Sequence, residues 1–150
     1  MKETSLAGAC LSVPAHVDSL AQVRGFVGSS ANSLGLLESA TDELLLAVDE
    51  AVSNIIMHGY AGRDGLIEVD MSADADAVTV RLRDDAPLFD PTGAAAPRLD
   101  ISPLERDCPG GYGVELVRRL VDGLRYRVSA EGRNELILVK SLATESRASP

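Results

Sequence analysis

Aromatic side chains are scarce in this sequence, and tryptophan is absent. Only 3% of the residues are aromatic, whereas the hydrophobic residues together make up 45%. The core of the folded protein is therefore expected to be built from aliphatic side chains. With 150 residues the chain is long enough to bury a sizeable core, and we expect a single domain over residues 1–150.

Basic residues are also in short supply. Lys and Arg number 14 against 23 Asp and Glu, so the formal net charge is -9. Binding to nucleic acid or to an anionic membrane surface needs clustered positive charge, so neither kind of partner is expected. The phosphates of a nucleotide would have to be held locally, by backbone N–H groups and a metal ion.

Cysteines are few, and long apolar runs are missing. The two cysteines are Cys10 and Cys108, whose spacing fits neither a metal site nor a disulfide framework. We expect both to be free thiols in a reducing compartment. No stretch reads as a signal peptide or has the length of a membrane span, so the expected location is the cytoplasm.

The most informative stretch is DELLLAVDEAVSNIIMHGY, residues 42–60. Apolar residues recur in it at steps of three and four, which is the period of an amphipathic helix. These residues are Leu45, Val48, Val52 and Ile55. The predicted helix is expected to be capped by Ser39 or Thr41 and to stop at Gly59.

Glu50 and Asn54 lie four residues apart, so they share one face of this predicted helix. A carboxylate and a carboxamide one turn apart, beside a core, can hold a metal ion and a water molecule together. Most pairs of this kind are only part of a solvated face. The pair alone therefore does not establish a functional site.

The remaining chain alternates between helical and strand periods. Apart from residues 42–60, helical spacing is found over residues 15–34 and again after residue 113. Strands with one apolar face are expected at residues 6–13, 67–71, 78–82, 124–128 and 136–139. The predicted fold class is α+β, a two-layer α/β sandwich with helices on one face of a mixed, mostly antiparallel sheet. The tail over residues 141–150 is expected to be frayed.

A long irregular segment precedes the last predicted helix. Residues 92–109 show no period, and loops of this length are usually functional or disordered. Gly110, Gly111, Tyr112 and Gly113 follow directly. Glycines that open a helix let the backbone approach an anion, toward which the first-turn N–H groups point. Glycines before a helix are often only a turn, so this motif alone leaves both interpretations open.

Four segments taken together resemble one family. The segments are ELLLAVDEAVSNIIMHGY, RDDAPLFDP, GGYGVELVRRLVD and GRNELILVK. In this combination the chain is similar to the anti-sigma factor serine kinases. They are a branch of the histidine kinase-like ATPase superfamily, with gyrase, the ninety-kilodalton heat-shock chaperone and the mismatch-repair ATPases. The resemblance extends from about residue 14 to residue 140.

The resemblance implies a role for each motif. Asn54 matches the asparagine that binds Mg²⁺ through its amide oxygen, and Glu50 matches the catalytic general base. Asp84 matches the carboxylate that accepts a hydrogen bond from the amine of adenine. Gly111 and Gly113 match the phosphate loop, with Gly110 directly before them, and Tyr112 between the glycines either leans over the phosphates or caps the pocket. Residues 92–109 would be a lid over the nucleotide, where Arg106 either reaches the γ-phosphate or remains a solvated loop residue.

Two positions depart from the pattern of that superfamily. Ala86 stands where a glycine is common, and because Pro87 follows, its backbone is pushed toward an extended conformation. Asn134 stands where many members have a threonine that helps to hold the adenine. Both residues are counted among the nucleotide-binding positions. The two changes bear on the affinity for nucleotide more than on the fold.

The resemblance implies an enzyme that uses ATP and Mg²⁺ to phosphorylate serine on a protein. The phosphoacceptor would be a small antagonist (anti-anti-sigma) protein, and the kinase would also bind a sigma factor or a comparable regulator. A homodimer is implied as well. Two alternatives stay open: a nucleotide-sensing module of the same fold without phosphotransfer, and an α/β interaction domain without a nucleotide site.

Overall fold

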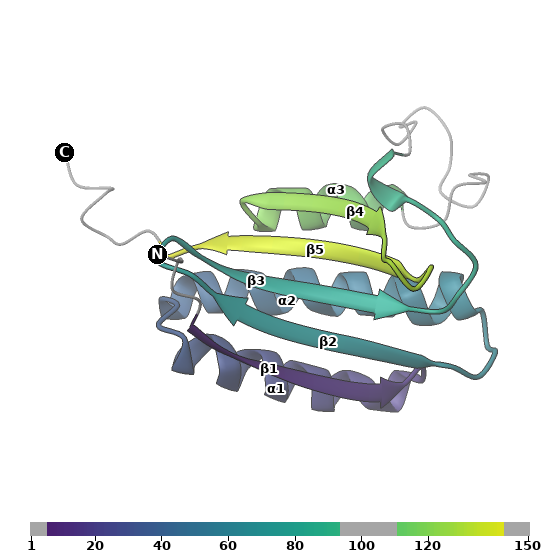
Figure 1. Cartoon of the computed structure of the whole chain (residues 1–150), viewed down its shortest axis with the longest axis horizontal. Helices are drawn as coiled ribbons and strands as arrows, with labels where there is room; N and C mark the ends of the chain where they lie inside the picture. The colour runs from purple at the N-terminus through teal and green to yellow at the C-terminus, as the bar shows by residue number, and fades with distance from the viewer. Residues whose placement is uncertain (1–5, 94–110, 143–150) are drawn as a thin grey trace.

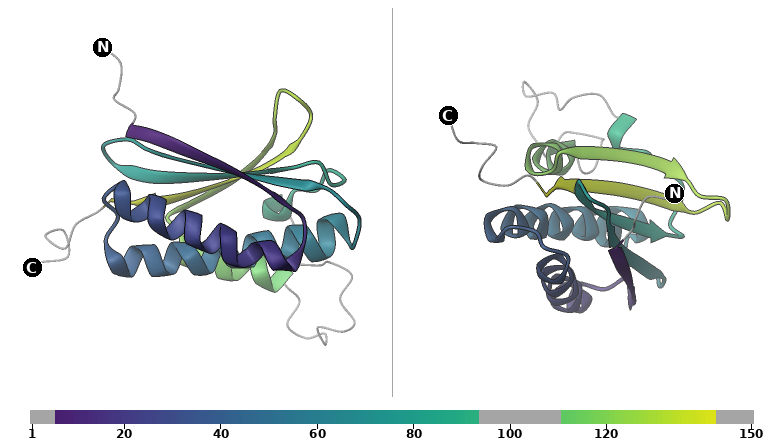
Figure 2. Two further views of the ribbon diagram at one scale, coloured as in Figure 1. Left: turned by 90° about the horizontal axis from the view of Figure 1, so that it is seen from below. Right: turned by 60° about the vertical axis from the view of Figure 1, so that its left-hand side comes forward.

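The computed structural model describes residues 6–93 and 111–142, which form a five-stranded sheet covered on one face by helices. The strands are β1 (Leu6–Pro14), β2 (Leu66–Ala73), β3 (Ala77–Asp84), β4 (Gly123–Val128) and β5 (Asn134–Ser141). Their order in the sheet is β1-β2-β3-β5-β4, and all four pairings are antiparallel. The helices lie behind the sheet in Figure 1 and below it in the left view of Figure 2. The predicted α+β sandwich is confirmed.

The helical layer contains three α-helices and several tighter or wider turns. The elements are η1 (Val17–Ser19), α1 (Leu20–Ser33), α2 (Glu38–Asn54), η2 (Ile55–Tyr60), η3 (Pro91–Gly93) and α3 (Gly111–Leu120). The single helix predicted over residues 15–34 is therefore a 3₁₀ turn followed by α1. In the part of the chain that the structure describes, no helix is long and apolar enough to cross a membrane.

The start of α2 differs from the prediction. The helix begins at Glu38 and is preceded by Leu37, which makes no side-chain capping bond. Neither Ser39 nor Thr41 caps it, because both lie inside the first turns. The Thr41 hydroxyl instead donates to the Leu37 carbonyl oxygen at 3.0 Å, a bond to the preceding turn that a threonine inside a helix commonly makes.

The end of α2 also differs from the prediction. The helix does not stop at Gly59, because it continues past Asn54 as the π-helix η2, which ends at Tyr60. Ala61 follows in the left-handed region with φ of 52°, and its N–H donates to the Ile56 carbonyl oxygen at 3.1 Å. Wide π turns of this kind are rare and are found mostly at functional sites.

Alternation along β2 and β3 explains why the sheet has one covered face. Val69 pairs with Leu82 and both are fully buried under the helices, whereas Glu68 pairs with Arg83 on the open face. The largest fully buried side chains are Leu, Ile, Met and Val. Among the described residues, Tyr60 is the sole aromatic side chain of the buried core, so the expectation of an aliphatic core is confirmed.

The open face of the sheet carries a row of paired charges. Glu135 is almost completely buried there, and it accepts from Arg83 at 2.9 Å and from Arg127 at 2.5 Å. Arg83 also pairs with Glu68 on the neighbouring strand at 3.4 Å. These charges balance one another across the strands, and the apolar and partly polar cavity described below lies on the helical side of the sheet.

Candidate functional site

One wall of the candidate site is the end of α2. Asn54 is the last residue of α2, and His58 follows it in the π-helix; both line the same cavity. The Asn54 carboxamide makes no hydrogen bond to any other residue that the structure describes. Its oxygen is therefore available to a ligand at the cavity surface.

The second wall is the end of β3, where the strand period turns Asp84 toward the helices. Only 4% of Asp84 is exposed. Its Oδ1 accepts from Asn134 Nδ2 at 2.9 Å and from the Ala86 N–H at 2.9 Å. Burial raises the pKa of this carboxyl, whereas the hydrogen bonds from Asn134 and from the Ala86 N–H lower it. The side chain thus combines an unfavourable environment for charge with donors that favour the charged form.

Between these walls lies a cavity of about 400 Å³. Its polar lining comes from α2, from η2, from the loop between η2 and β2, and from β3 and β5. The residues include Asn54, His58, Arg63, Asp84 and Asn134. The apolar lining includes Ile55, Leu88, Phe89, Val117 and Leu136. A concave, mostly apolar surface with a few convergent polar groups is typical of small-molecule sites.

The cavity brings together four of the described residues that the sequence singled out. Asn54, Asp84, Ala86 and Asn134 all line it, although they are up to 80 positions apart in the chain. Val114 lines it as well, which places the first turns of α3 beside it. Gly111, Tyr112 and Gly113 form the first turn of that helix, as the glycine motif predicts.

Three other predicted site residues are not among the described residues of the cavity lining. Glu50 does not line the cavity; it is half-buried on α2, one turn before Asn54. Gly110 and Arg106 lie outside the described residues, as does nearly all of the predicted lid over residues 92–109. The roles of these residues therefore remain predictions.

Ala86 fits the place that a glycine was expected to hold. Its backbone does not have positive φ, since Ala61 is the non-glycine residue with that conformation among those described. Its methyl group faces Gly59, where an added Cβ would lie 3.3 Å away. The methyl group thus closes the floor of the cavity against the π-helix without backbone strain.

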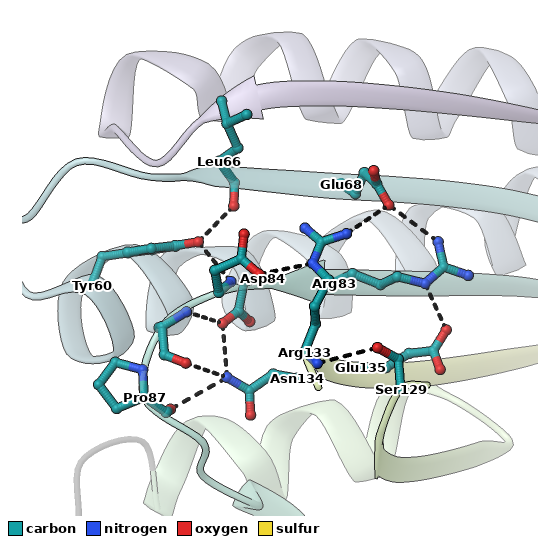
Figure 3. A network of polar contacts seen from close by, with 12 residues as sticks. Tyr60, Leu66, Glu68, Arg83, Asp84, Pro87, Ser129, Arg133, Asn134 and Glu135 are labelled. Atoms are coloured by element: carbon teal, nitrogen blue, oxygen red, sulfur yellow. Dashed lines mark hydrogen bonds and ion pairs between the residues drawn. The ribbon is translucent and has the colours of Figure 1, made fainter. Parts of the chain in front are cut away.

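Tyr60 is a residue whose contribution the sequence did not reveal. Its hydroxyl donates to the Leu66 carbonyl oxygen at 2.7 Å and accepts from the Asp85 N–H at 2.8 Å. Figure 3 shows this bridge between the end of the π-helix and the end of β3. The ring lies against Gly65, where a Cβ would come within 2.1 Å of the Tyr60 Cε1 atom. Tyr60 is the only aromatic residue of the segment formed by α2 and η2, and Gly65 follows it closely in the sequence. This combination was the signal from which a packed tyrosine could have been predicted.

The donor set at the cavity fits Mg²⁺ bound together with phosphates. Among the residues that the structure describes, no group of three or more His, Cys, Asp or Glu side chains could hold a metal ion alone. Magnesium, however, keeps several waters and takes its remaining ligands from one or two protein oxygens and the phosphates of a substrate. The Asn54 amide oxygen accepts no hydrogen bond from the described part of the chain, so it suits that arrangement.

Comparison with known proteins leads to the same class of protein. Residues 13–140 match the histidine kinase-like ATPase domain, and the chain belongs to this family. The predicted position among the anti-sigma factor serine kinases is also confirmed by the relatives of this chain. Membership of an ATPase family implies the use of ATP.

The named relatives are protein serine or serine/threonine kinases, the enzyme class that the sequence predicts. Serine/threonine-protein kinase BtrW of Bordetella bronchiseptica is 34% identical over 104 residues, 69% of this chain and 72% of that protein. Serine-protein kinase RsbW of Oceanobacillus iheyensis is 26% identical over 122 residues, 77% of this chain and 75% of that protein. RsbW of Listeria innocua is 29% identical, with 77% and 76% covered.

A solved structure shows the same fold. The crystal structure of the RsbU and RsbW domains of Rv1364c from Mycobacterium tuberculosis superposes with a TM-score of 0.62 at 18% identity. The match covers 89% of this chain and 32% of that larger protein. At this identity the likeness supports the arrangement of helices and strands, and it does not extend to substrates or partners.

Proposed function

We propose that this chain is an ATP-dependent serine protein kinase that phosphorylates a small antagonist protein and, in its other state, binds a sigma factor or a comparable regulator. The observation that carries the proposal is the shared cavity of Asn54, Asp84 and the start of α3. In this proposal Asn54 binds the metal ion, Asp84 contacts the adenine ring, and the start of α3 lies beside the phosphates of the same nucleotide. We further propose Mg²⁺ as the metal, a cytoplasmic location and a homodimer.

The residues divide the work of phosphotransfer. Bound at Asn54, Mg²⁺ would offset the negative charge that develops on the transferred phosphoryl group. Glu50 would accept the proton of the serine hydroxyl. At the same time the serine oxygen would form a bond to the γ-phosphorus, and the bond between the γ-phosphorus and the β–γ bridging oxygen would break. Phosphoserine and ADP are the products. Among the described residues Glu50 forms no ion pair, so its carboxylate is free to take the proton.

Asn54→Ala tests the metal arm of this proposal. Removal of the amide oxygen is expected to weaken binding of Mg-ATP about tenfold, because the ion keeps its waters and phosphate ligands but loses one protein ligand. Calorimetry with ATP in Mg²⁺ and in EDTA measures this effect. The variant and the wild type should bind alike in EDTA. A loss of equal size in both conditions would contradict the metal role of Asn54.

The position of Glu50 also indicates where the phosphoacceptor must approach. Glu50 is half-buried on α2 and does not line the cavity, so we expect the serine hydroxyl to reach it from the surface of α2 rather than through the cavity. Leu46 lies one turn before Glu50 on the same face, and its side chain is 50% exposed. An exposed leucine beside the proposed base is a suitable contact for a protein substrate.

Leu46→Asp tests this approach. The substitution is expected to lower kcat/KM for a purified antagonist protein from the same genome by about tenfold, since it puts charge into an apolar contact. ATP affinity should stay the same. Leu66→Asp is the matched control, because Leu66 is 53% exposed but lies on β2, on the face of the sheet that no helix covers. Equal effects of the two variants would reject the assigned surface.

The main alternative is a nucleotide-sensing module of the same fold. It is favoured by the absence of Glu50 from the cavity lining. Tight binding of ATP without phosphate transfer to any antagonist protein would select this alternative over the kinase.

A further inference from the structure

We propose that Asn134 is a positioning residue for base recognition, which holds the Asp84 carboxylate in place and does not itself bind the nucleotide. The inference deepens the proposed function, because it takes Asp84 as the reader of adenine. It changes the role of Asn134, which the sequence places among the nucleotide contacts.

The donor side of the Asn134 carboxamide is fully used within the protein. Its Nδ2 donates to Asp84 Oδ1 at 2.9 Å and to the Ala86 carbonyl oxygen at 3.0 Å, with the Pro87 carbonyl oxygen close by at 3.3 Å. A carboxamide nitrogen has two hydrogens to donate. Figure 3 shows that these bonds fan out from one nitrogen toward the loop after β3. No donor remains for a ligand.

The acceptor side is used as well. Asn134 Oδ1 accepts from the Phe89 N–H at 3.1 Å and from the Tyr126 hydroxyl at 2.5 Å. A carboxamide oxygen has two lone pairs, and both are thereby engaged. Asn134 is only 7% exposed. A nucleotide could bond to it only by breaking one of these buried bonds.

The consequence for Asp84 is a carboxylate with two different oxygens. Oδ1 accepts from Asn134 and from the Ala86 N–H. Within the described part of the chain, no hydrogen bond reaches Oδ2. The carboxylate is thus fixed through one oxygen while the other remains available in the cavity, which is the geometry needed to accept a single N–H from an exocyclic amine.

The next peptide of the loop is held from the opposite side. The Asp85 N–H donates to the Tyr60 hydroxyl at 2.8 Å, and Arg133 holds the Asp85 side chain through an ion pair of 2.9 Å. The loop that presents Asp84 is therefore anchored by Tyr60 at the end of the π-helix and by Arg133 and Asn134 at the start of β5 (Figure 3). Loss of Asn134 would leave the bonds of Tyr60 and Arg133 to Asp85 in place.

The charges around Asp84 determine how its release would depend on pH. Among the residues that the structure describes, Asp85, Arg133, Tyr60 and Tyr126 act electrostatically on Asp84. His58 and Arg63 line the same cavity. Burial and the Asp85 charge raise the pKa of Asp84, whereas the Asn134 and Ala86 hydrogen bonds and Arg133 lower it. Without Asn134 the pKa should rise further, so the carboxyl becomes protonated at a higher pH and accepts the amine less well.

Asn134→Ala tests the proposal with two nucleotides, ATP and inosine triphosphate, in which a carbonyl oxygen replaces the adenine amine. Affinity for ATP is expected to fall about tenfold at pH 7, with a larger loss at pH 6 and a smaller loss at pH 8.5. Affinity for inosine triphosphate should hardly change. Equal losses for both nucleotides at every pH would instead show that Asn134 binds the nucleotide directly, and would overturn the proposal.

Carbon-13 NMR of the Asp84 carboxyl in nucleotide-free protein separates this inference from the kinase proposal. In Asn134→Ala the carboxyl should titrate at a higher pH than in the wild type, and an unchanged midpoint would reject the positioning role. This readout remains informative even if the wild type binds no ATP, a result that would count against the proposed function alone.

Two further variants test whether the shift of the Asp84 midpoint comes from the loss of the Asn134 hydrogen bond or from a general disturbance of the structure around it. Tyr126→Phe removes the hydroxyl that donates to Asn134 and leaves Asp84 untouched; it should shift the Asp84 midpoint in the same direction by less. Ser129→Ala disturbs the same β4–β5 connection, where the Ser129 hydroxyl accepts from the Arg133 N–H at 3.2 Å. It should leave the midpoint unchanged. A reversed order of these two effects would contradict the proposal.

Discussion

Glu50→Gln is expected to lower the rate of phosphotransfer by about 10²–10⁴-fold while leaving the affinity for ATP unchanged. The amide has the size of the carboxylate but cannot accept the serine proton, so the contribution of general base catalysis is lost. Nucleotide binding should persist because Glu50 does not line the cavity. Transfer of labelled phosphate to a purified antagonist protein, together with calorimetry, measures the two effects separately.

Asp49→Asn is the matched control for this experiment. Asp49 is the neighbouring carboxylate on α2, but it pairs with Arg24 of α1 at 2.6 Å. Because that pair is partly exposed, its loss should cost less than about 1 kcal/mol of stability and should not affect transfer. Undiminished transfer by Glu50→Gln, or an equal loss in Asp49→Asn, would remove Glu50 from the role of base.

The hairpin of β2 and β3 shows what sequence alone predicts well. Polar and apolar residues alternate there, and a slip of one residue in the pairing would move the apolar side chains of one strand from the covered face to the open face. The same local logic places Asp84 on the covered face at the strand end. Periodicity is a property of neighbouring residues, so it can be read without knowing the tertiary structure.

The end of α2 shows where local patterns are insufficient. The sequence suggested a stop at Gly59, but the chain continues through a π-helix to Tyr60. What stabilises this wide turn is tertiary: the Tyr60 hydroxyl bonds to Leu66 and Asp85. No local rule connects a tyrosine at the end of a helix to the far end of a strand 25 residues later.

Asn134 shows the same limit at the candidate site. Its position was found by resemblance to a family with threonine there, and this suggested contact with the nucleotide. The structure shows five hydrogen bonds from its carboxamide to protein groups between 8 and 50 positions away. Saturation of a polar side chain depends on all of its neighbours at once, so a single motif cannot reveal it.

Asp84→Asn is expected to weaken ATP binding by at least about a hundredfold and to strengthen binding of inosine triphosphate. The oxygen of the new amide can still accept from Asn134 and from the Ala86 N–H, which leaves its NH₂ group facing the cavity. The NH₂ group of the new side chain and the exocyclic amine of adenine are both donors, so they could not form a hydrogen bond with each other. The carbonyl oxygen of inosine, by contrast, could accept a hydrogen bond from the NH₂ group. Calorimetry with both nucleotides measures the inversion, and an equal loss for both would contradict base reading by Asp84.

The same substitution should stabilise the nucleotide-free fold. Since burial raises the pKa of Asp84, the folded state favours the protonated carboxyl, and the ionised form costs folding free energy at neutral pH. That cost falls as the pH drops through the raised pKa toward the value of the unfolded chain. At pH 7 Asp84→Asn is therefore expected to raise Tm by about 2–4 °C for each kcal/mol recovered. The gain should shrink as the pH is lowered to 4. A gain that is constant with pH would show that burial of the charge is not its cause, and a lower Tm at pH 7 would show that the carboxylate stabilises the fold through its two hydrogen bonds.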